Sequence, residues 1–505
     1  MLSTLLLGLL VLAGDVDRPN VVVIMADDLG YGDVSCYGTA ALETPHIDAL
    51  AASGRRFTSG YCSASTCTPT RYSFLTGTYA FRKPNTGIAP PNSPAIIAAG
   101  TPTVASLLRD AGYRTAVIGK WHLGLGEGQP DWNGTLAPGP LEIGFDECLL
   151  LPTTNDRVPQ VYVKDRRVLN LDPADPLWVG KTKPSPDHPT GKTNRDELKM
   201  DWSHGHNDTI HNGISRIGFY TGGHAARFRD EDLADRWVDE SKAFLAQQAE
   251  SDEPFFLFFS SHDLHVPRMP HERFQGATSL GYRGDSIAQL DWCVGELVAE
   301  LRRLDLTEST LVIFCSDNGP VLDDGYVDGA LPLLGTHDAN GPYRGGKYSV
   351  YEGGTRTPLI ASWPGTIKPA VSDELVCTID LPATLAAIAG QTLPGDAALD
   401  SFDVSAAILG TGPTTRSSLV QQDNGKSGTY GYRVGKWKLQ RHDKLKARNV
   451  TVGQTLANTP VPRYQLFDLD ADPQERNDIS DLQPERLAEM QVELLAIIAD
   501  GRSRP

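Results

Sequence analysis

The sequence is poor in cysteine and has no apolar run of transmembrane length. Its seven cysteines in 505 residues show no tight spacing, so neither a disulfide framework nor a zinc knuckle is predicted. An apolar stretch within residues 1–14 is too short to span a bilayer. This stretch predicts a signal peptide, and hence a protein that is exported to a periplasm or secreted and that has no transmembrane span.

Basic residues are also scarce relative to acidic ones. The chain has 46 Lys and Arg residues against 63 Asp and Glu residues, which gives a formal net charge of -17. Such a charge argues against nucleic acids or anionic membranes as the main binding partners. If the ligand is itself an anion, its site must gather the cationic side chains locally.

Apolar strand-like runs alternate with helix-like runs between about residue 18 and residue 410. Helices are expected at residues 103–111, 233–248, 287–304 and 375–389. The alternation predicts an α/β domain with a mostly parallel sheet that is covered by helices on both faces. Residues 153–229 break the pattern, and their Trp, Tyr and His content favours an ordered, lid-like insertion beside the functional site.

The character of the sequence changes after a Gly-, Pro- and Thr-rich stretch at residues 410–415. Residues 432–439 and 464–469 alternate in hydrophobicity like strands, and residues 484–498 have the pattern of a helix. We therefore expect a large domain over residues 18–410 and a small α+β subdomain over residues 411–505.

Two strand-like runs each end in a group of oxygen-bearing side chains. Residues 21–25 and 311–315 are continuous apolar runs, which predict strands buried on both faces. The side chains that follow them are Asp27 and Asp28 after the first run, and Asp317 and Asn318 after the second. Ligands bind at strand ends in α/β sheets, and this set of oxygens suits Ca²⁺ or Mg²⁺ better than zinc. The alternative is two unrelated acidic turns.

Two further strand-like runs lead into histidines. One precedes Lys120 and His122, whose side chains point the same way if the chain stays extended. The other, at residues 255–259, is followed by His262 and His265. The sequence therefore predicts that Lys120 and His122 face one cavity.

One short segment resembles the signature of a known enzyme family. Cys67, Pro69 and Arg71, followed by a Thr-Gly pair, are similar to the sulfatase signature, in which the cysteine is oxidised to formylglycine. Taken alone, Cys67 could equally be a buried thiol beside a turn proline. Many members of the family have a small Ser or Ala before the arginine, whereas this chain has Thr70.

Other segments resemble the same family in the same order along the chain. Residues 112–122 match every fixed position of the second sulfatase signature. Residues 344–347 and 352–358 resemble the family's R-G-G-K and E-G-G-x-R-x-P block. On these matches the chain is identified as a member of the sulfatase family.

The resemblance implies an alkaline-phosphatase-like fold, with a large, mostly parallel sheet between helices and a small C-terminal subdomain of one antiparallel sheet and one helix. It also implies hydrolysis of sulfate monoesters by a hydrated formylglycine at position 67. A formylglycine-generating enzyme would be a partner during maturation. One Ca²⁺ ion is implied, with ligands from Asp27, Asp28, residue 67 (Cys67 in the sequence), Asp317 and Asn318.

The resemblance also assigns roles to the remaining site residues. Asp317 is the candidate base that activates the nucleophile. The implied donors to the sulfate oxygens are Arg71, Lys120, His122 and Lys347. His265 is the implied acid that protonates the leaving alcohol, and His262 is its rival.

Two segments of the insertion point to the substrate. Residues 154–159 and 203–206 resemble segments of bacterial sulfatases that act on galactose or N-acetylgalactosamine 6-sulfates. An Asp-Arg pair with a nearby histidine can bracket sugar hydroxyls, so the candidate substrate-binding residues are Asp156, Arg157, His204 and His206. The alternative is a surface ion pair with solvated histidines in a loop.

Two other functions remain open at this point. The first is a phosphoester or phosphonate hydrolase of the same superfamily, which would use the same nucleophile on phosphorus. The second is a non-catalytic relative that binds carbohydrate. The single-metal oxygen set and the Gly-Lys-x-His signature favour sulfate, and every expected catalytic position is filled.

Overall fold

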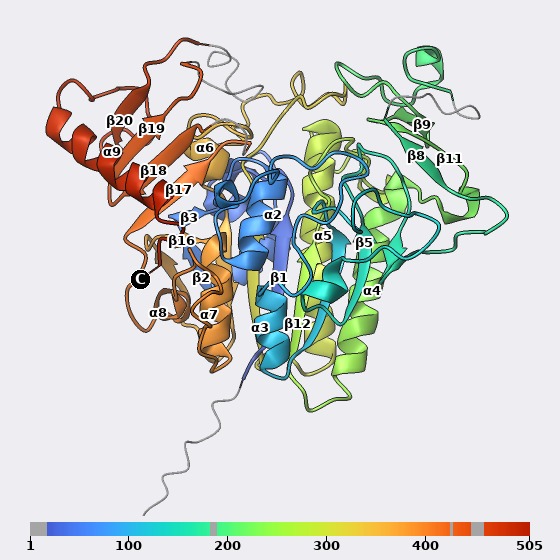
Figure 1. Cartoon of the computed structure of the whole chain (residues 1–505), viewed down its shortest axis with the longest axis horizontal. Helices are drawn as coiled ribbons and strands as arrows, with labels where there is room; N and C mark the ends of the chain where they lie inside the picture. The colour runs from blue at the N-terminus through green and yellow to red at the C-terminus, as the bar shows by residue number, and fades with distance from the viewer. Residues whose placement is uncertain (1–17, 182–188, 425–427, 446–458, 505) are drawn as a thin grey trace, which may run out of the picture.

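The computed structural model describes residues 18–181, 189–424, 428–445 and 459–504. The predicted signal peptide at residues 1–14 therefore lies outside the described residues. Within the described ranges, no helix is both long enough and apolar enough to cross a membrane. A ten-stranded sheet and a separate four-stranded sheet organise the fold (Figure 1).

The ten-stranded sheet has a parallel centre and mixed margins. Its central strands are, in spatial order, β13 (Thr310–Ser316), β1 (Asn20–Ala26), β12 (Phe255–Ser260), β4 (Arg114–Lys120) and β5 (Glu147–Leu151). The margins are β15 (Ala370–Ser372), β2 (Arg55–Phe57) and β14 (Leu359–Ser362) beside β13, and β6 (Val163–Lys164) and β7 (Arg167–Val168) beside β5. β14 and β6 each run antiparallel to both neighbours. The predicted mostly parallel sheet is confirmed.

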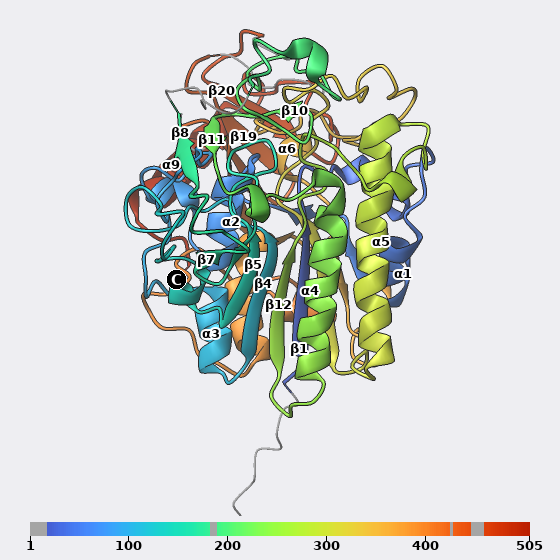
Figure 2. The same cartoon turned by 90° about the vertical axis from the view of Figure 1, so that its right-hand side faces the viewer.

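Helices cover both faces of this sheet, because successive side chains of a strand point to opposite sides. In β1, Val21 and Val23 belong to one apolar core, and Val22 and Ile24 belong to the other. The first core is covered by α2 (Cys67–Thr76), α3 (Val104–Asp110) and α7 (Leu381–Ile388). The second is covered by α1 (Pro45–Ser53), α4 (Leu233–Gln248) and α5 (Gly281–Arg303). Figure 2 shows the sheet between these two layers.

Three of the four predicted helices are found near their predicted positions, as α3, α4 and α5. α5 begins at Gly281 rather than at residue 287, because its first turns carry glycine and polar residues without apolar periodicity. The prediction of one helix over residues 375–389 is wrong. Its first part forms β16 (Val376–Cys377), which pairs with β3 (Gly60–Tyr61), and α7 starts only where Pro382 favours a first helical turn.

The irregular stretch at residues 153–229 does more than form a lid, because it contains β6 and β7 of the main sheet. Two small sheets follow in the same stretch: β8 (Trp178–Gly180) pairs with β11 (Phe219–Thr221), and β9 (Ile210–His211) pairs with β10 (Ile214–Ser215). They lie on the side of the molecule toward which β1 runs (Figure 1). This part of the insertion therefore lies on the same side of the molecule as the carboxyl ends of the central strands.

The C-terminal part forms a four-stranded antiparallel sheet, as the resemblance implied. Its strands are β17 (Ser418–Gln422), β18 (Tyr430–Val434), β19 (Trp437–Arg441) and β20 (Tyr464–Asp468), and α9 (Pro484–Ala499) packs on it. The prediction of one strand over residues 432–439 is wrong. That run spans a hairpin turn, with Gly435 at φ +56° between β18 and β19. The domain boundary between residues 410 and 411, just after α8 (Ser405–Leu409), stays a prediction.

A buried cluster of charges joins this small sheet to the main domain. Lys438 on β19 donates to Glu352, the first residue of α6 (Glu352–Thr355), at 2.7 Å. Glu475 lies 3.8 Å from the same ammonium group and accepts hydrogen bonds from Gln440 Nε2 and the Glu352 backbone, each at 2.6 Å. All three charged side chains are fully buried. Removal of Lys438 would therefore take away the cation between two buried acids, although Glu352 would keep its contact with Arg356 at 3.3 Å.

We expect Lys438→Met to lower the free energy of unfolding by about 3–5 kcal/mol, because the Glu352 carboxylate would lose its main counter-charge inside the protein. Lys436→Met is the matched control, because Lys436 pairs with Asp468 at the surface and exposed pairs contribute little. Urea unfolding of the two variants measures the difference. Equal stability of both variants and the unmutated protein would contradict the structural role of the cluster.

Candidate active site

The predicted oxygen-bearing residues meet at the carboxyl ends of β1 and β13. The parallel register pairs the last residues of the two strands, so the residues that follow leave the sheet side by side. The backbone N–H of Asp28 donates to Asp317 Oδ1 at 3.3 Å, and Asn318 Nδ2 donates to Asp28 Oδ1 at 2.7 Å. Asp27, Asp28, Asp317 and Asn318 are all buried.

Each of the three carboxylates is paired with a buried cationic side chain. The pairs are Asp27 with Lys120, Asp28 with Lys347 at 2.8 Å, and Asp317 with Arg71 at 2.9 Å. Burial, reinforced by the Asp317 charge, raises the pKa of Asp27. Burial also opposes ionisation of Asp28, but Lys347 and Lys120 outweigh it and lower the pKa of that carboxyl group. The Lys and Arg side chains that are expected to bind an anion are thus held in place by the carboxylates that are expected to bind a metal cation.

The oxygen atoms at the ends of β1 and β13 are suitable ligands for a hard divalent cation. Asp27 Oδ1 and Asn318 Oδ1 are buried oxygen atoms without a hydrogen-bond partner among the residues that the structure describes. Asp27, Asp28 and His265 each offer one atom that could bind a metal ion, and these three atoms lie within 4.8 Å of one another. Carboxylate and amide oxygens are the ligands that Ca²⁺ and Mg²⁺ prefer. The arrangement is therefore a possible Asp-rich metal site.

Cys67 is the first residue of α2, a helix whose ten side chains are all buried. The segment before it is fixed by the small sheet, because the Ser65 backbone N–H donates to the Gln422 carbonyl of β17 at 2.9 Å. Cys67 Sγ lies 3.2 Å from His122 Nδ1. Burial raises the pKa of the thiol, although Lys120 opposes that shift. An unmodified Cys67 would consequently be a poor nucleophile at neutral pH.

His122 faces the nucleophile with one ring nitrogen. Its Nε2 lies 3.0 Å from the Ala89 carbonyl oxygen, so Nε2 carries the proton and Nδ1 can accept a hydrogen bond from residue 67. Burial, followed by the charge of Lys120, lowers the pKa of His122 well below its usual value. β4 ends at Lys120, and His122 has φ +55°, so this side chain reaches Cys67 through a turn and not through strand alternation.

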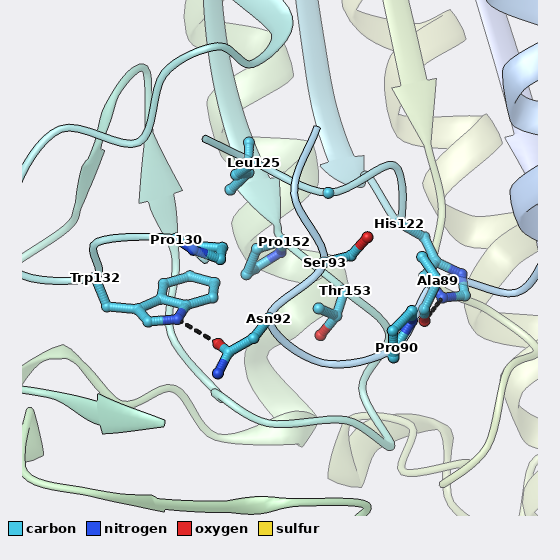
Figure 3. Close-up of a pocket in the computed structure, with 11 residues that line it drawn as sticks. Ala89, Pro90, Asn92, Ser93, His122, Leu125, Pro130, Trp132, Pro152 and Thr153 are labelled. Carbon is cyan, nitrogen blue, oxygen red and sulfur yellow. Dashed lines mark hydrogen bonds between the residues drawn. The ribbon is translucent and has the colours of Figure 1, made fainter. Parts of the chain in front are cut away.

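A small cavity lies behind His122, on the side away from Cys67. Figure 3 shows its lining, which includes Ala89, Pro90 and the hydrogen-bonded pair Trp132 and Asn92. Its volume is about 10 Å³, enough for one water molecule and far too small for a sugar. The cavity is therefore too small to be a substrate pocket.

Of the two candidate acids, His265 lies at the metal-site carboxylates. Its Nδ1 donates to the Val266 carbonyl at 2.8 Å, which leaves Nε2 available. His262 instead accepts a hydrogen bond from Trp237 Nε1 on α4. Burial and the Lys347 ammonium group lower the pKa of His265 well below its usual value. The geometry favours His265 over His262.

Asp156, Arg157 and His206 form one cluster next to His265. Arg157 Nη1 donates to Asp156 Oδ1 at 2.8 Å, and His206 Nε2 lies 3.0 Å from Asp156 Oδ2. Asp156 Oδ1 is 4.0 Å from His265 Nδ1. Although burial opposes it, Arg157 lowers the pKa of Asp156 well below its usual range, so the carboxylate is ionised. A surface ion pair is ruled out here, because the Asp156 side chain is only 2% exposed.

His204, the fourth predicted substrate-binding residue, is not part of this cluster. Its side chain is 58% exposed and its Nδ1 lies 3.9 Å from Asp323 Oδ1. The prediction grouped His204 with His206 because both belong to the segment at residues 203–206 that carries the resemblance. The chain turns between them, because the His206 backbone N–H donates to the His204 carbonyl at 2.9 Å, and only His206 points inward.

Sequence reasoning missed two polar side chains at the site, Asp324 and Tyr348. Lys347 Nζ donates to Asp324 Oδ2 at 2.8 Å, and the Tyr348 hydroxyl donates to Asp324 Oδ1 at 3.0 Å. Asp324 lies in an irregular stretch without periodicity, so no pattern marks it. A signal that could have been used is Tyr348, an aromatic residue directly after the predicted Lys347.

Comparison with known proteins gives consistent matches. A model of the sulfatase family matches residues 19–391. An N-acetylgalactosamine-6-O-sulfatase from Bacteroides thetaiotaomicron is 47% identical over 474 residues, which cover 94% of this chain and 92% of that protein. Arylsulfatase A from Homo sapiens is 34% identical over 466 residues, which cover 90% of this chain and 82% of that protein.

A solved structure gives the same result. It comes from a study of glycosaminoglycan metabolism by Bacteroides thetaiotaomicron, and it matches with a TM-score of 0.91 and 46% identity. The match covers 95% of this chain and 99% of that chain. Family model, sequence relatives and structure agree with the paired charges around Cys67: the chain belongs to the sulfatase family and is a sulfuric ester hydrolase.

Proposed function

We propose that this enzyme removes the 6-sulfate group from N-acetylgalactosamine or galactose units of a sulfated carbohydrate. The observation that carries the proposal is the buried cluster of Asp156, Arg157 and His206 next to His265. These groups can contact sugar hydroxyls close to the oxygen that leaves. The relative from Bacteroides thetaiotaomicron, which is named as an N-acetylgalactosamine-6-O-sulfatase, supports the same substrate class.

The proposal includes two groups that the chain acquires. Residue 67 is formylglycine, and one Ca²⁺ ion is held by residue 67 with Asp27, Asp28, Asp317 and Asn318. When present, the hydrated aldehyde supplies the hydroxyl that attacks sulfur, and the cation polarises the sulfate oxygens. The buried thiol of Cys67 lacks this reactivity, because its pKa is raised by burial.

Side chains of the protein position the sulfate group. Arg71, Lys120 and Lys347 supply N–H donors to its oxygens, over which negative charge is spread. His122 Nδ1 is unprotonated and accepts a hydrogen bond from the group at position 67, 3.2 Å from the present Sγ atom. Asp317 is the candidate base for the proton of the nucleophile.

His265 protonates the leaving group. A sugar alkoxide is a poor leaving group, so its oxygen needs a proton as the bond breaks. Because Nδ1 of His265 keeps its proton on the Val266 carbonyl, Nε2 can give a proton only from the doubly protonated ring, and the negative charge of the bound sulfate ester would favour that form. The bond from sulfur to the sugar oxygen breaks while the bond from the nucleophile oxygen to sulfur forms, and the sugar departs as a neutral alcohol.

Asp156 recognises the configuration of the sugar. Arg157 holds both of its oxygens at 2.8 Å, and His206 fixes the carboxylate from a second side. A carboxylate fixed in this way can accept a hydrogen bond from an axial hydroxyl at C4. An equatorial hydroxyl would point elsewhere and leave one acceptor position of the buried carboxylate unfilled, which is a basis for rejection.

Maturation and location follow from the same proposal. Cys67 is 1% exposed, so the formylglycine-generating enzyme must reach it before α2 packs into the protein. The predicted signal peptide at residues 1–14 would direct the protein to a periplasm or to the outside, where sulfated carbohydrates are accessible.

We expect residue 67 to be formylglycine in the active enzyme. The tryptic peptide that ends at Arg71 should then have the mass of the aldehyde and react with a hydrazide. Cys67→Ala should reduce turnover by at least about 10³-fold, because the nucleophile is lost. Cys293→Ala is the matched control, because this buried cysteine lies in α5, away from the site, and the variant should keep both the hydrazide reaction and the activity. An unmodified thiol in fully active protein would refute the assignment.

We expect one Ca²⁺ ion per chain, and its loss in Asp317→Asn. The substitution keeps the size of the side chain and removes one of the charges that hold the cation. Elemental analysis and the rise in melting temperature on Ca²⁺ addition measure binding without relying on activity. Asp323→Asn, at the outer rim, should still bind the ion. Full activity after exhaustive chelation, with no metal detected, would contradict the prediction.

We expect Asp156→Asn to reduce kcat/KM for N-acetylgalactosamine 6-sulfate by about 10- to 100-fold, because a charge-assisted hydrogen bond to the sugar is lost. The loss on 4-nitrophenyl sulfate, which has no hydroxyls to recognise, should be much smaller. His206→Ala should show the same selective loss, whereas His204→Ala should not, because its side chain points to solvent. Equal losses of Asp156→Asn on both substrates would rule out the pocket assignment.

A further inference from the structure

The loop that carries Asp324 packs against His206, which in turn contacts Asp156. Trp202 forms an isolated bridge with Tyr326, and the Ser203 backbone N–H donates to the Gly325 carbonyl at 2.9 Å. Gly325 has φ +112°, and a Cβ atom there would lie 1.8 Å from His206 Nδ1. The absence of a side chain at this position therefore lets the loop pack directly against the ring of His206.

Asp324 is held firmly but still has acceptor capacity. Its Oδ2 accepts from Lys347 at 2.8 Å, and its Oδ1 accepts from the Tyr348 hydroxyl at 3.0 Å. An ionised carboxylate offers about four lone-pair positions. Because the Asp324 side chain is 15% exposed, a ligand can reach it. The neighbouring Asp323 instead accepts from Ser203 Oγ at 2.7 Å, at the outer rim.

Tyr348 adopts a backbone conformation that aromatic residues rarely use. Its φ is +72°, in the left-handed region that favours glycine, and it directly follows Lys347. Such strained positions are found at functional sites, where the side chain is needed in one place. In this backbone conformation the Tyr348 hydroxyl donates a hydrogen bond to Asp324.

Asp324 and Asp156 both lie within electrostatic reach of His265. Burial and Lys347 lower the pKa of His265, and the two carboxylates oppose that shift. The same two carboxylates act on Arg157: burial lowers its pKa, and Asp156, Tyr348 and Asp324 are among the groups that raise it. The proposed acid is thus bordered by two fixed carboxylates, of which only one has been assigned to the sugar.

We propose that Asp324 is a second specificity-determining residue, which accepts a hydrogen bond from a hydroxyl group of the sugar, and that Tyr348 is the positioning residue that holds it. This inference rests on the proposed function in one respect, that the substrate is a sugar sulfate. Lys347 contacts both Asp28 at the metal site and Asp324 at the rim, both at 2.8 Å, so recognition of the sugar is tied in space to the position of the sulfate.

The measured quantity is the ratio of kcat/KM for the best sugar 6-sulfate to kcat/KM for 4-nitrophenyl sulfate. The sugar panel contains galactose, N-acetylgalactosamine and N-acetylglucosamine 6-sulfates. Because Lys347 loses a partner in Asp324→Asn, both rates can change in that variant, but the ratio isolates the contact with the sugar. We expect Asp324→Asn to lower this ratio by about 10- to 100-fold, mainly through a higher KM. Asp323→Asn is the matched control and should leave the ratio unchanged.

Tyr348 is tested with two substitutions. Tyr348→Phe removes only the hydroxyl and should lower the ratio by about 2- to 10-fold. Tyr348→Gly should lower it further, while the melting temperature stays the same or rises, because glycine relieves the backbone strain. Tyr113→Phe is the control, because that buried hydroxyl has no hydrogen-bond partner within the described part of the chain. A lower melting temperature in Tyr348→Gly with equal losses on all substrates would show a merely structural role and overturn the assignment of Tyr348.

The two proposals fail in different ways. If the unmutated enzyme prefers N-acetylglucosamine 6-sulfate, the proposed galacto substrate is wrong, and the ratio for that sugar still tests Asp324. If the unmutated enzyme prefers a galacto sugar but the ratio is unchanged in Asp324→Asn, the role of Asp324 is overturned while the proposed function stands.

Discussion

The active site depends on one constraint, the cost of burying three carboxylates where two neighbouring strands end. β1 and β13 are apolar on both faces, so Asp27, Asp28 and Asp317 leave the sheet directly into a buried region. Their cationic partners come from α2, from the end of β4 and from the loop before α6. These segments are far apart in sequence, so the site is complete only when sheet, helix and loop have packed together.

The same pairing explains how a chain with a net charge of -17 can act on an anion. Each carboxylate that can bind a metal cation is paired with a cationic side chain that can bind a sulfate oxygen. The negative and the positive charges of the site are therefore concentrated at one place. Lys347 extends this arrangement outward, because it donates to Asp28 and to Asp324. If Asp324 binds the sugar as proposed, recognition of the sugar and of the sulfate share one ammonium group, and a change at Asp324 should affect the reacting centre.

The strand ends were the most predictable part of the site. An unbroken apolar run followed by acids is typical of a buried strand that ends at a polar site, and parallel register then brings such ends together. The sequence predicted that His122 faces the site because alternate residues of a strand point the same way. His122 does lie next to Cys67, but its backbone turns at φ +55° and does not continue the strand. Asp324 was missed and His204 was misplaced because both lie in irregular segments. Their positions depend on contacts between residues 201–206 and 323–327, and no periodic pattern in a sequence encodes such contacts.

The central claim, a sulfatase built to recognise a galacto-configured sugar, is tested most directly by two epimeric substrates. N-acetylgalactosamine 6-sulfate and N-acetylglucosamine 6-sulfate differ only in the orientation of the hydroxyl at C4. Sulfate release from each by the unmutated enzyme should give a kcat/KM that is at least about 10²-fold higher for the galacto sugar, because the fixed Asp156 carboxylate meets only the axial hydroxyl. Equal values, or a preference for the gluco sugar, would contradict the account.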